Sequence, residues 1–359
     1  MLYLFLVEVT MKEENKNQNK TKKIIKNLSF LIILIILTYY FIFRKIDRKG
    51  LQEALSHTNI LFIIIALIVA FGNIFFEGVN HYRNLNLLKE NVSFKNSLKY
   101  AIVGFFFSAI TPAATGGQPV QIYYMHKDKI SYTNATVVIL VQSFSYLLCM
   151  LLLGIFGYIY NFKYITSLGF FEYFFFIGVI VNFAIITISL LAMFSKKLAN
   201  KLLNFVYKIV DKFNHDKAIS IKEKMSNNLK EYHDSTDFIK NNKSVLTKSI
   251  LTSMMQLITY HSVAYFVYLA LGVEHLNYIQ ITSLQSLLYL SVSILPLPGT
   301  VGVNETGFGI IYKPLILVSA IVDSSMLLTR GVGFYFYVVL TGIILLIESL
   351  KKKQVKEDA

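Results

Sequence analysis

Several residue types that build common functional sites are scarce in this sequence. Among 359 residues there is one cysteine, Cys149, and no tryptophan. A single cysteine excludes a disulfide framework, a zinc site or an iron–sulfur cluster made from the cysteines of one chain, and we interpret Cys149 as a small apolar helix residue. The P-loop, HExxH and GxSxG patterns are also missing, so we predict no catalytic residue, no metal site and no cofactor.

Charged residues are few as well, and apolar residues are abundant. Charged residues make up 16% of the chain and hydrophobic residues 55%, with a mean hydropathy of +0.54. A soluble domain has about 45 to 50% apolar residues even when glycine is counted, so lipid is the expected solvent. Uncharged, mostly apolar stretches cover residues 28–43, 58–76, 100–125, 133–162, 173–195, 249–273, 275–304 and 331–347. Because a spanning helix needs about 17 to 25 such residues, the sequence predicts an all-α polytopic membrane protein with about 8 transmembrane helices.

The positive charge lies between the apolar stretches. The formal net charge is +14, but twelve lysines fall in residues 196–248, six before residue 28 and four in the last eleven residues. This placement is typical of cytoplasmic loops and argues against nucleic acid as a partner. We therefore predict that both termini and the Lys-rich segment are cytoplasmic, although four basic residues at 44–49 lie in a loop expected on the outside.

The Lys-rich segment divides the membrane part into two halves. The predicted divisions are a cytoplasmic segment 1–27, a first membrane half 28–195, a linker 196–248, a second membrane half 249–348 and a tail 349–359. Apolar residues from Leu198 to Phe213 recur every three or four positions, as in an amphipathic helix. Such a helix lies on an anionic inner leaflet or serves as a solvated connector, and the sequence leaves both open.

All five prolines fall in two neighbourhoods, one in each half. They are Pro112, Pro119, Pro296, Pro298 and Pro314, within SAITPAATGGQPVQIYYM (108–125) and SILPLPGTVGVNETGFGIIYKP (293–314). Proline and glycine weaken a helix, so each half should contain a broken or re-entrant segment, and broken helices in corresponding halves indicate a transporter's binding site. Simple proline kinks are the alternative. We expect the first segment to dip in and return, and the second to cross the membrane fully.

Glu305 and Arg330 are isolated charges at membrane depth. A carboxylate there normally pairs with a cation, and Arg330 is the only arginine of the second half. The guanidinium would bind a lipid phosphate while Glu305 meets a cationic head group or holds the arginine in place. A purely structural ion pair, or snorkelling of the arginine, is the alternative.

The first proline-rich segment offers neutral donors. The amides of Gly116 and Gly117 are able to point toward one anion, and Gln118 and Gln121 add side-chain donors. The predicted substrate-binding residues are Thr111, Pro112, Gly116, Gly117, Gln118, Pro119, Gln121, Pro298, Gly299, Gly302, Glu305 and Arg330.

Two other polar groups lie in apolar stretches. Glu77, Asn80, His81 and Arg83 come at the end of the second stretch, where we interpret them as marking the cytoplasmic interface, with a functional site as the alternative. Gln256 and His261 are interpreted as hydrogen-bonding groups between helices rather than as ligands.

The runs TPAATGGQPVQIYYM and LPLPGTVGVNETGF resemble the transmembrane family named after lysylphosphatidylglycerol synthase, which includes the flippase part of MprF and YbhN-like membrane proteins. The resemblance covers roughly residues 28–350. It implies a membrane module that moves aminoacylated phosphatidylglycerol between leaflets, while in MprF a separate soluble domain transfers lysine from charged tRNA. Here the chain stops at Ala359, so we expect the synthase domain to be missing and a separate synthase to be a partner.

The preferred hypothesis is a lipid flippase of a bacterial cytoplasmic membrane that handles an anionic or aminoacylated phospholipid such as lysylphosphatidylglycerol. Under the resemblance it would contribute to resistance against antimicrobial peptides. A phosphatidylglycerol lysyltransferase and a passive membrane scaffold are the alternatives.

Overall fold

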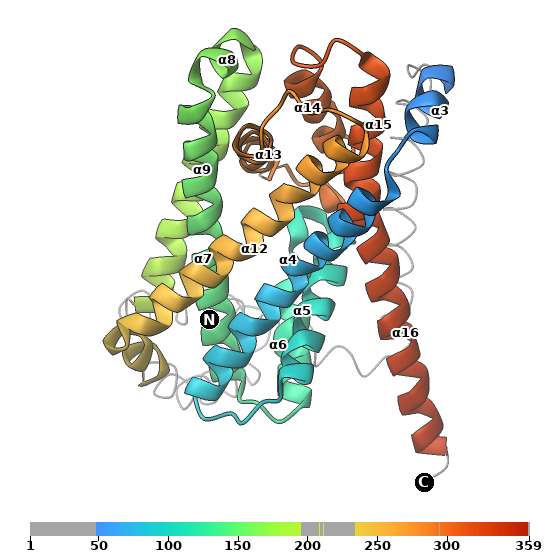
Figure 1. Cartoon of the computed structure of the whole chain (residues 1–359). Helices are drawn as coiled ribbons and strands as arrows, with labels where there is room; N and C mark the ends of the chain where they lie inside the picture. Colours follow the sequence, from blue (N-terminus) through green and yellow to red (C-terminus); the bar gives the residue numbers. More distant parts are fainter. Residues whose placement is uncertain (1–47, 195–207, 209–210, 212–233, 294, 358–359) are drawn as a thin grey trace.

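The computed structural model describes residues 48–194, 208, 211, 234–293 and 295–357, and within these ranges every regular element is a helix (Figure 1). The helices are α3 (Arg48–Ser56), α4 (Ile60–Leu87), α5 (Phe94–Ala109), η2 (Pro112–Ala114), α6 (Gly117–Lys127), α7 (Tyr132–Tyr160), α8 (Phe162–Ser167), α9 (Phe170–Phe194), α12 (Lys243–Ala270), α13 (Tyr278–Val292), η3 (Pro298–Thr300), α14 (Val303–Tyr312), α15 (Ser319–Arg330), η4 (Gly331–Tyr335) and α16 (Phe336–Glu357). The apolar stretch 28–43 and the amphipathic pattern at 198–213 lie outside the described residues, except for positions 208 and 211.

Within the described residues, four helical stretches are long and apolar enough to cross a membrane. They are Ile60–Leu87, Tyr132–Tyr160, Phe170–Leu191 and Ser319–Glu348, the last made of α15, η4 and α16 together. Their outward side chains are large and apolar, as in Ile68 and Ile180, each 67% exposed. Such a surface suits lipid and not water. The all-α membrane class is therefore confirmed, while the number of about 8 crossings stays a prediction.

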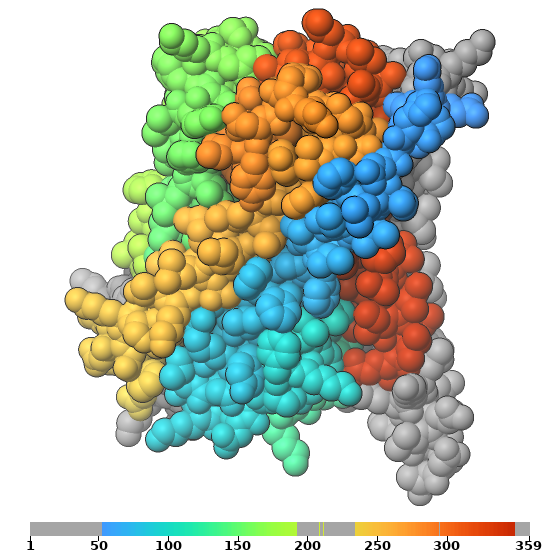
Figure 2. All heavy atoms as spheres, in the orientation of Figure 1, coloured from blue at the N-terminus to red at the C-terminus, as the bar shows by residue number. Residues whose placement is uncertain are grey.

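Helices α4 and α12 pack side by side along one face, where they form two diagonal bands (Figures 1 and 2). Polar groups join them: Asn80 Nδ2 donates to Ser253 Oγ at 3.2 Å, and Asn84 Nδ2 donates to Ser249 Oγ at 3.1 Å. Gly72 lets the backbones approach, because a Cβ there would lie 2.7 Å from Thr259 Oγ1. Small residues and buried amides are the usual means of packing helices within a bilayer.

Helices α5 and α6 form a re-entrant hairpin whose tip is η2. The end of α6 returns to the start of α5, where Lys99 Nζ and Asp128 Oδ2 form an ion pair at 2.5 Å. Helices α13 and α14 form a second hairpin whose tip is η3, and the Tyr312 hydroxyl at its end donates to Ile281 O at 3.2 Å. Both proline-rich segments therefore turn back inside the bundle. This confirms the predicted broken or re-entrant segment in each half.

The two hairpins enter from opposite ends of the molecule. The bases of α5 and α6 lie at the end where α12 begins and α16 finishes, whereas α13 and α14 lie toward the other end, where α8 and α3 are also found (Figure 1). Their tips η2 and η3 touch, and Ile110, Val301 and Phe334 belong to one apolar cluster around that contact. Two hairpins of opposite orientation are the arrangement of an inverted repeat.

The expectation that the second proline-rich segment crosses fully is wrong. Three residues near its tip have positive φ, namely Gly299 at 58°, Thr300 at 53° and Gly302 at 89°, and together they reverse the chain. The crossing that carries the chain to the other end is made by α15, η4 and α16 instead.

Candidate functional site

Glu305 holds the start of α14 in place at the second hairpin tip. Its Oε2 accepts a hydrogen bond of 2.7 Å from the Gly302 amide, which caps the helix. Its Oε1 accepts from Arg330 Nε at 2.8 Å and from the Tyr335 hydroxyl at 3.1 Å. The side chains of Glu305 and Arg330 are 4% and 6% exposed. The cation proposed from the sequence for Glu305 is thus in contact with it.

Arg330 fastens the turn η3 as well. Its Nη2 donates to Gly299 O at 2.8 Å, and its guanidinium lies over the rings of Phe334 and Tyr335 at 4.4 and 5.3 Å from their centroids. Only glycine fits at position 299, since a Cβ there would lie 2.3 Å from Phe334 Cζ. These contacts occupy two of the three guanidinium nitrogens, so a ligand of Arg330 has to use the remaining N–H groups.

The first hairpin tip is open to its surroundings. Pro112, Ala113, Ala114 and Thr115 are all exposed, and the two alanines have φ of 52° and 53°. The left-handed residues of this tip are therefore alanines, whereas Gly116 has a φ of −83°. Irregular backbone of this kind is tolerated at membrane depth only when it is buried in protein or lines a wet cavity.

Gly116 and Gly117 serve the close packing of the hairpin. A Cβ at Gly117 would lie 2.0 Å from Ser108 Oγ and 2.7 Å from Gly104 O, and one at Gly116 would lie 2.6 Å from Thr111 Cγ2. The Gly116 amide already donates to Thr111 Oγ1 at 2.9 Å. The glycines bring α6 against α5, and this places the start of α6 at the tip.

The start of α6 has no side-chain cap. Gln118 is exposed there and donates through Nε2 to Ser143 Oγ at 2.7 Å, while Pro119 has no N–H to satisfy. An uncapped helix start carries unpaired amides and the positive end of the helix dipole, a combination that favours anions.

Gln121 does not belong to the tip. It lies one turn further along α6 and is buried, with Nε2 donating to Glu77 Oε1 at 2.6 Å and to Tyr100 O at 3.1 Å. His81 Nε2 is 3.4 Å from the same Glu77 oxygen. The polar residues at the end of the second apolar stretch therefore face other helices. The sequence could not reveal the contact between Gln121 and Glu77, because the two residues are 44 positions apart in the chain.

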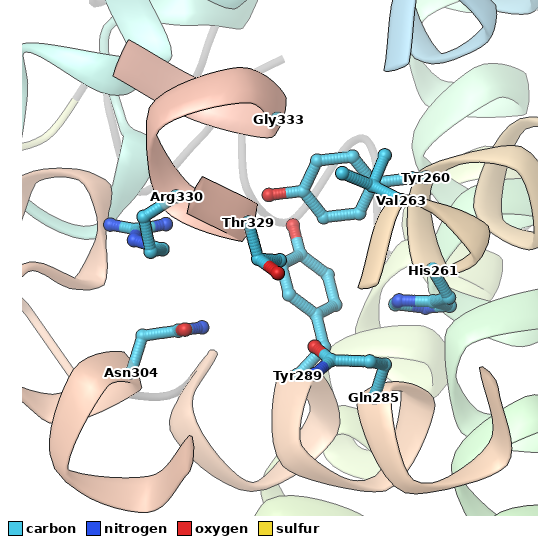
Figure 3. A pocket seen from close by; sticks show the side chains of 9 residues that line it. All are labelled: Tyr260, His261, Val263, Gln285, Tyr289, Asn304, Thr329, Arg330 and Gly333. Carbon is cyan, nitrogen blue, oxygen red and sulfur yellow. The ribbon is translucent and has the colours of Figure 1, made fainter. Parts of the chain in front are cut away.

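A small polar cavity lies beside Arg330 (Figure 3). Its volume is about 20 Å³, enough for one water molecule. It is lined by Tyr260, His261, Val263, Gln285, Tyr289, Asn304, Thr329, Arg330 and Gly333. His261 Nε2 and Thr329 Oγ1 are buried there without a hydrogen-bond partner.

Gln256 joins three helices, as the sequence indicated. Its Nε2 donates to Asn73 Oδ1 at 3.0 Å, and its Oε1 accepts from Gln142 Nε2 at 3.1 Å. The same interpretation of His261 has no such contact to support it, since this ring lines the cavity with its Nε2 unpaired.

Two groups of predicted site residues thus meet at the centre of the bundle. Thr111, Pro112, Gly116, Gly117, Gln118 and Pro119 build the first tip, and Pro298, Gly299, Gly302, Glu305 and Arg330 build the second. Long apolar helices around two inverted re-entrant hairpins define the class: a polytopic all-α membrane protein.

The chain belongs to the family described as the lysylphosphatidylglycerol synthase TM region, whose model matches residues 27–341. It is also similar to two archaeal proteins named UPF0104 membrane proteins. The one from Archaeoglobus fulgidus is 22% identical over 320 residues, covering 85% of this chain and 93% of the relative. The one from Pyrococcus horikoshii is 21% identical over 327 residues, covering 88% and 93%.

Proposed function

We propose that this protein is a flippase that moves an anionic or aminoacylated phospholipid, such as phosphatidylglycerol or lysylphosphatidylglycerol, between membrane leaflets. The observation that carries the proposal is the contact between η2 and η3, where helices of two oppositely oriented hairpins begin side by side. Half-helix starts at the bundle centre are the usual ion and substrate sites of secondary transporters.

The first tip would hold the lipid phosphate. The amides of Ala114 and Thr115 already bond to backbone oxygens of the turn, so the uncapped start of α6 would supply the amide donors. Gln118 would supply a neutral side chain without adding a buried charge. The second tip would provide Arg330's remaining N–H groups for the phosphate, while the Glu305 carboxylate favours the ammonium group of a lysyl lipid.

A transport assay tests the proposal against its alternatives. Purified protein is placed in vesicles of phosphatidylcholine and phosphatidylglycerol that contain a short-chain fluorescent phosphatidylglycerol, and a membrane-impermeant quencher reports which leaflet holds the probe. A flippase speeds the exchange of the probe between leaflets relative to protein-free vesicles. No acceleration contradicts the proposal and favours a passive scaffold. Formation of new lysyl-lipid when lysyl-tRNA is supplied would favour a phosphatidylglycerol lysyltransferase.

We also propose that both termini and the Lys-rich linker face the cytoplasm of a bacterial cell, and that a separate synthase supplies the lysyl lipid. The orientation is testable with single cysteines in a Cys149→Ala background, because Cys149 is buried. A cysteine at Lys163, at the α8 end, should react with an impermeant reagent on intact cells, whereas one at Lys243, at the start of α12, should not. The reverse pattern would invert the topology.

A further inference from the structure

Another carboxylate, the half-buried Glu77, lies within the candidate span of α4. Its side chain is 18% exposed, and that of its neighbour His81 is fully buried. Among the described residues, His81 is the one basic side chain within ion-pair distance of Glu77. Arg83, further along α4, instead donates to Thr252 Oγ1 on α12 at 3.0 Å and to Asn80.

The Glu305–Arg330 and Glu77–His81 pairs differ in kind. Arg330 keeps its proton in proteins, so the charge opposite Glu305 is permanent. An imidazole differs from a guanidinium in that it is able to change its charge within the physiological pH range. A carboxylate within a membrane is costly unless something neutralises it. At Glu77 the group that neutralises the charge is therefore exchangeable.

The hydrogen bonds around Gln121 indicate where that proton lies. Three atoms lie within hydrogen-bonding distance of Gln121 Nε2, namely the acceptors Glu77 Oε1 at 2.6 Å and Tyr100 O at 3.1 Å, and His81 Nε2 at 3.3 Å. An amide has only two hydrogens to donate, and the two shorter contacts use both. His81 Nε2 then faces the Glu77 carboxylate at 3.4 Å, and a proton between these two atoms satisfies both.

A polar connection leads from Glu77 toward the tips. Tyr146 on α7 and Tyr289 on α13 both lie within electrostatic range of Glu77, and their hydroxyls are 3.0 Å apart. Tyr289 is also within range of Arg330, and its hydroxyl points to the same side as Thr329 in the cavity (Figure 3). In the described part of the chain, Tyr146, Tyr289 and His81 are thus titratable groups that interact with Glu77. A change of charge at Glu77 therefore acts on Tyr289, which lines the cavity beside Arg330.

We propose that Glu77 and His81 form a proton-binding site, and that binding and release of this proton drives lipid movement. The coupling to transport rests on the proposed function, whereas the proton site itself does not.

Infrared spectroscopy of the purified protein tests the site without any transport. Acidification produces carbonyl bands of all carboxyls that become protonated, so difference spectra are compared: one component of the wild-type band should be lost in Glu77→Gln and kept in Glu172→Gln, a matched change at the start of α9. A Glu77→Gln spectrum that lacks no component of the wild-type band overturns the site. Should Glu77→Gln not fold, His81→Gln replaces it: the band should then appear at a different pH from that of the wild type, and an unchanged pH overturns the shared site.

Vesicles with an imposed pH gradient test the coupling. One proton per lipid gives a limiting difference in leaflet distribution of about tenfold for each unit of pH. The fluorescent phosphatidylglycerol should accumulate in one leaflet with the wild type and with Glu172→Gln, and this response should vanish in Glu77→Gln. If the wild type exchanges the lipid between leaflets without any effect of the pH gradient, the proposed coupling is overturned. If no variant moves lipid while the infrared band titrates as expected, the flippase proposal fails and the proton site stands.

Discussion

The two hairpin tips share one topology but are stabilised in different ways. The second tip is buried and held by charge: Glu305 caps α14, and Arg330 bonds to both Glu305 and the turn η3. The first tip is exposed, its helix α6 starts without a side-chain cap, and close glycine packing together with the hydrogen bond from the Gly116 amide to Thr111 Oγ1 holds it against α5. The comparison indicates that the second tip is fixed by buried charge, whereas the first tip presents exposed backbone at its surface.

Removing one charge from the second tip should have the largest effect. Glu305→Gln or Arg330→Gln leaves its partner charged and buried, at a cost of about 3 to 5 kcal/mol in unfolding free energy. The double variant should lose less than the sum of the two single losses, by about 0.5 to 3 kcal/mol. Denaturation in detergent measures all three. Lys99→Gln is the control: it breaks an ion pair whose side chains are 20% and 24% exposed, which is worth about 0 to 1 kcal/mol. Additive losses at Glu305 and Arg330 would show that the tip is not fixed by this pair.

A bulkier residue in the first tip should have an intermediate effect. Gly117→Val places atoms against Ser108 and the Gly104 carbonyl, and overpacking of this kind costs about 1 to 3 kcal/mol. Gly309→Val on α14 is the matched control, because its nearest neighbour is the end of the Lys313 side chain at 3.8 Å, and it should change stability by about 0.5 kcal/mol or less. Thermal unfolding in detergent compares them. Normal stability of Gly117→Val together with loss of bound lipid would mean that Gly117 contacts the phosphate directly.

A charge at the first tip should have the smallest effect on stability and a selective effect on binding. Gln118→Glu puts a carboxylate in the first turn of α6, where it stabilises the helix by about 0.3 to 1 kcal/mol. It should repel a phosphate and weaken retention of phosphatidylglycerol by about tenfold, or about 1.4 kcal/mol. Native mass spectrometry measures the retained lipid. Gln280→Glu, in the first turn of α13 at the base of the other hairpin, is the control. Equal retention in both variants would place the lipid elsewhere.

The sequence predicted the membrane class, the two broken segments and the Glu305–Arg330 pair, because hydropathy, proline clustering and isolated charges are local signals. The direction of the second segment was missed, since it depends on φ angles at Gly299, Thr300 and Gly302 that composition does not specify. The packing role of Gly117 could not be predicted either, because glycine is needed there only when the folded hairpin brings Ser108 against it. The contact of Gln121 with Glu77 needs three helices to be assembled before it exists.

The contact between the two tips also has an electrical consequence. Since one hairpin re-enters from each end, the cluster around Ile110, Val301 and Phe334 lies where the two tips meet. An elementary charge that crosses the whole membrane exchanges about 2.3 kcal/mol per 100 mV with the field. Phosphatidylglycerol carries one negative charge, and its lysyl ester carries one net positive charge. Under the proposed function, the same voltage therefore favours opposite directions of movement for the two lipids.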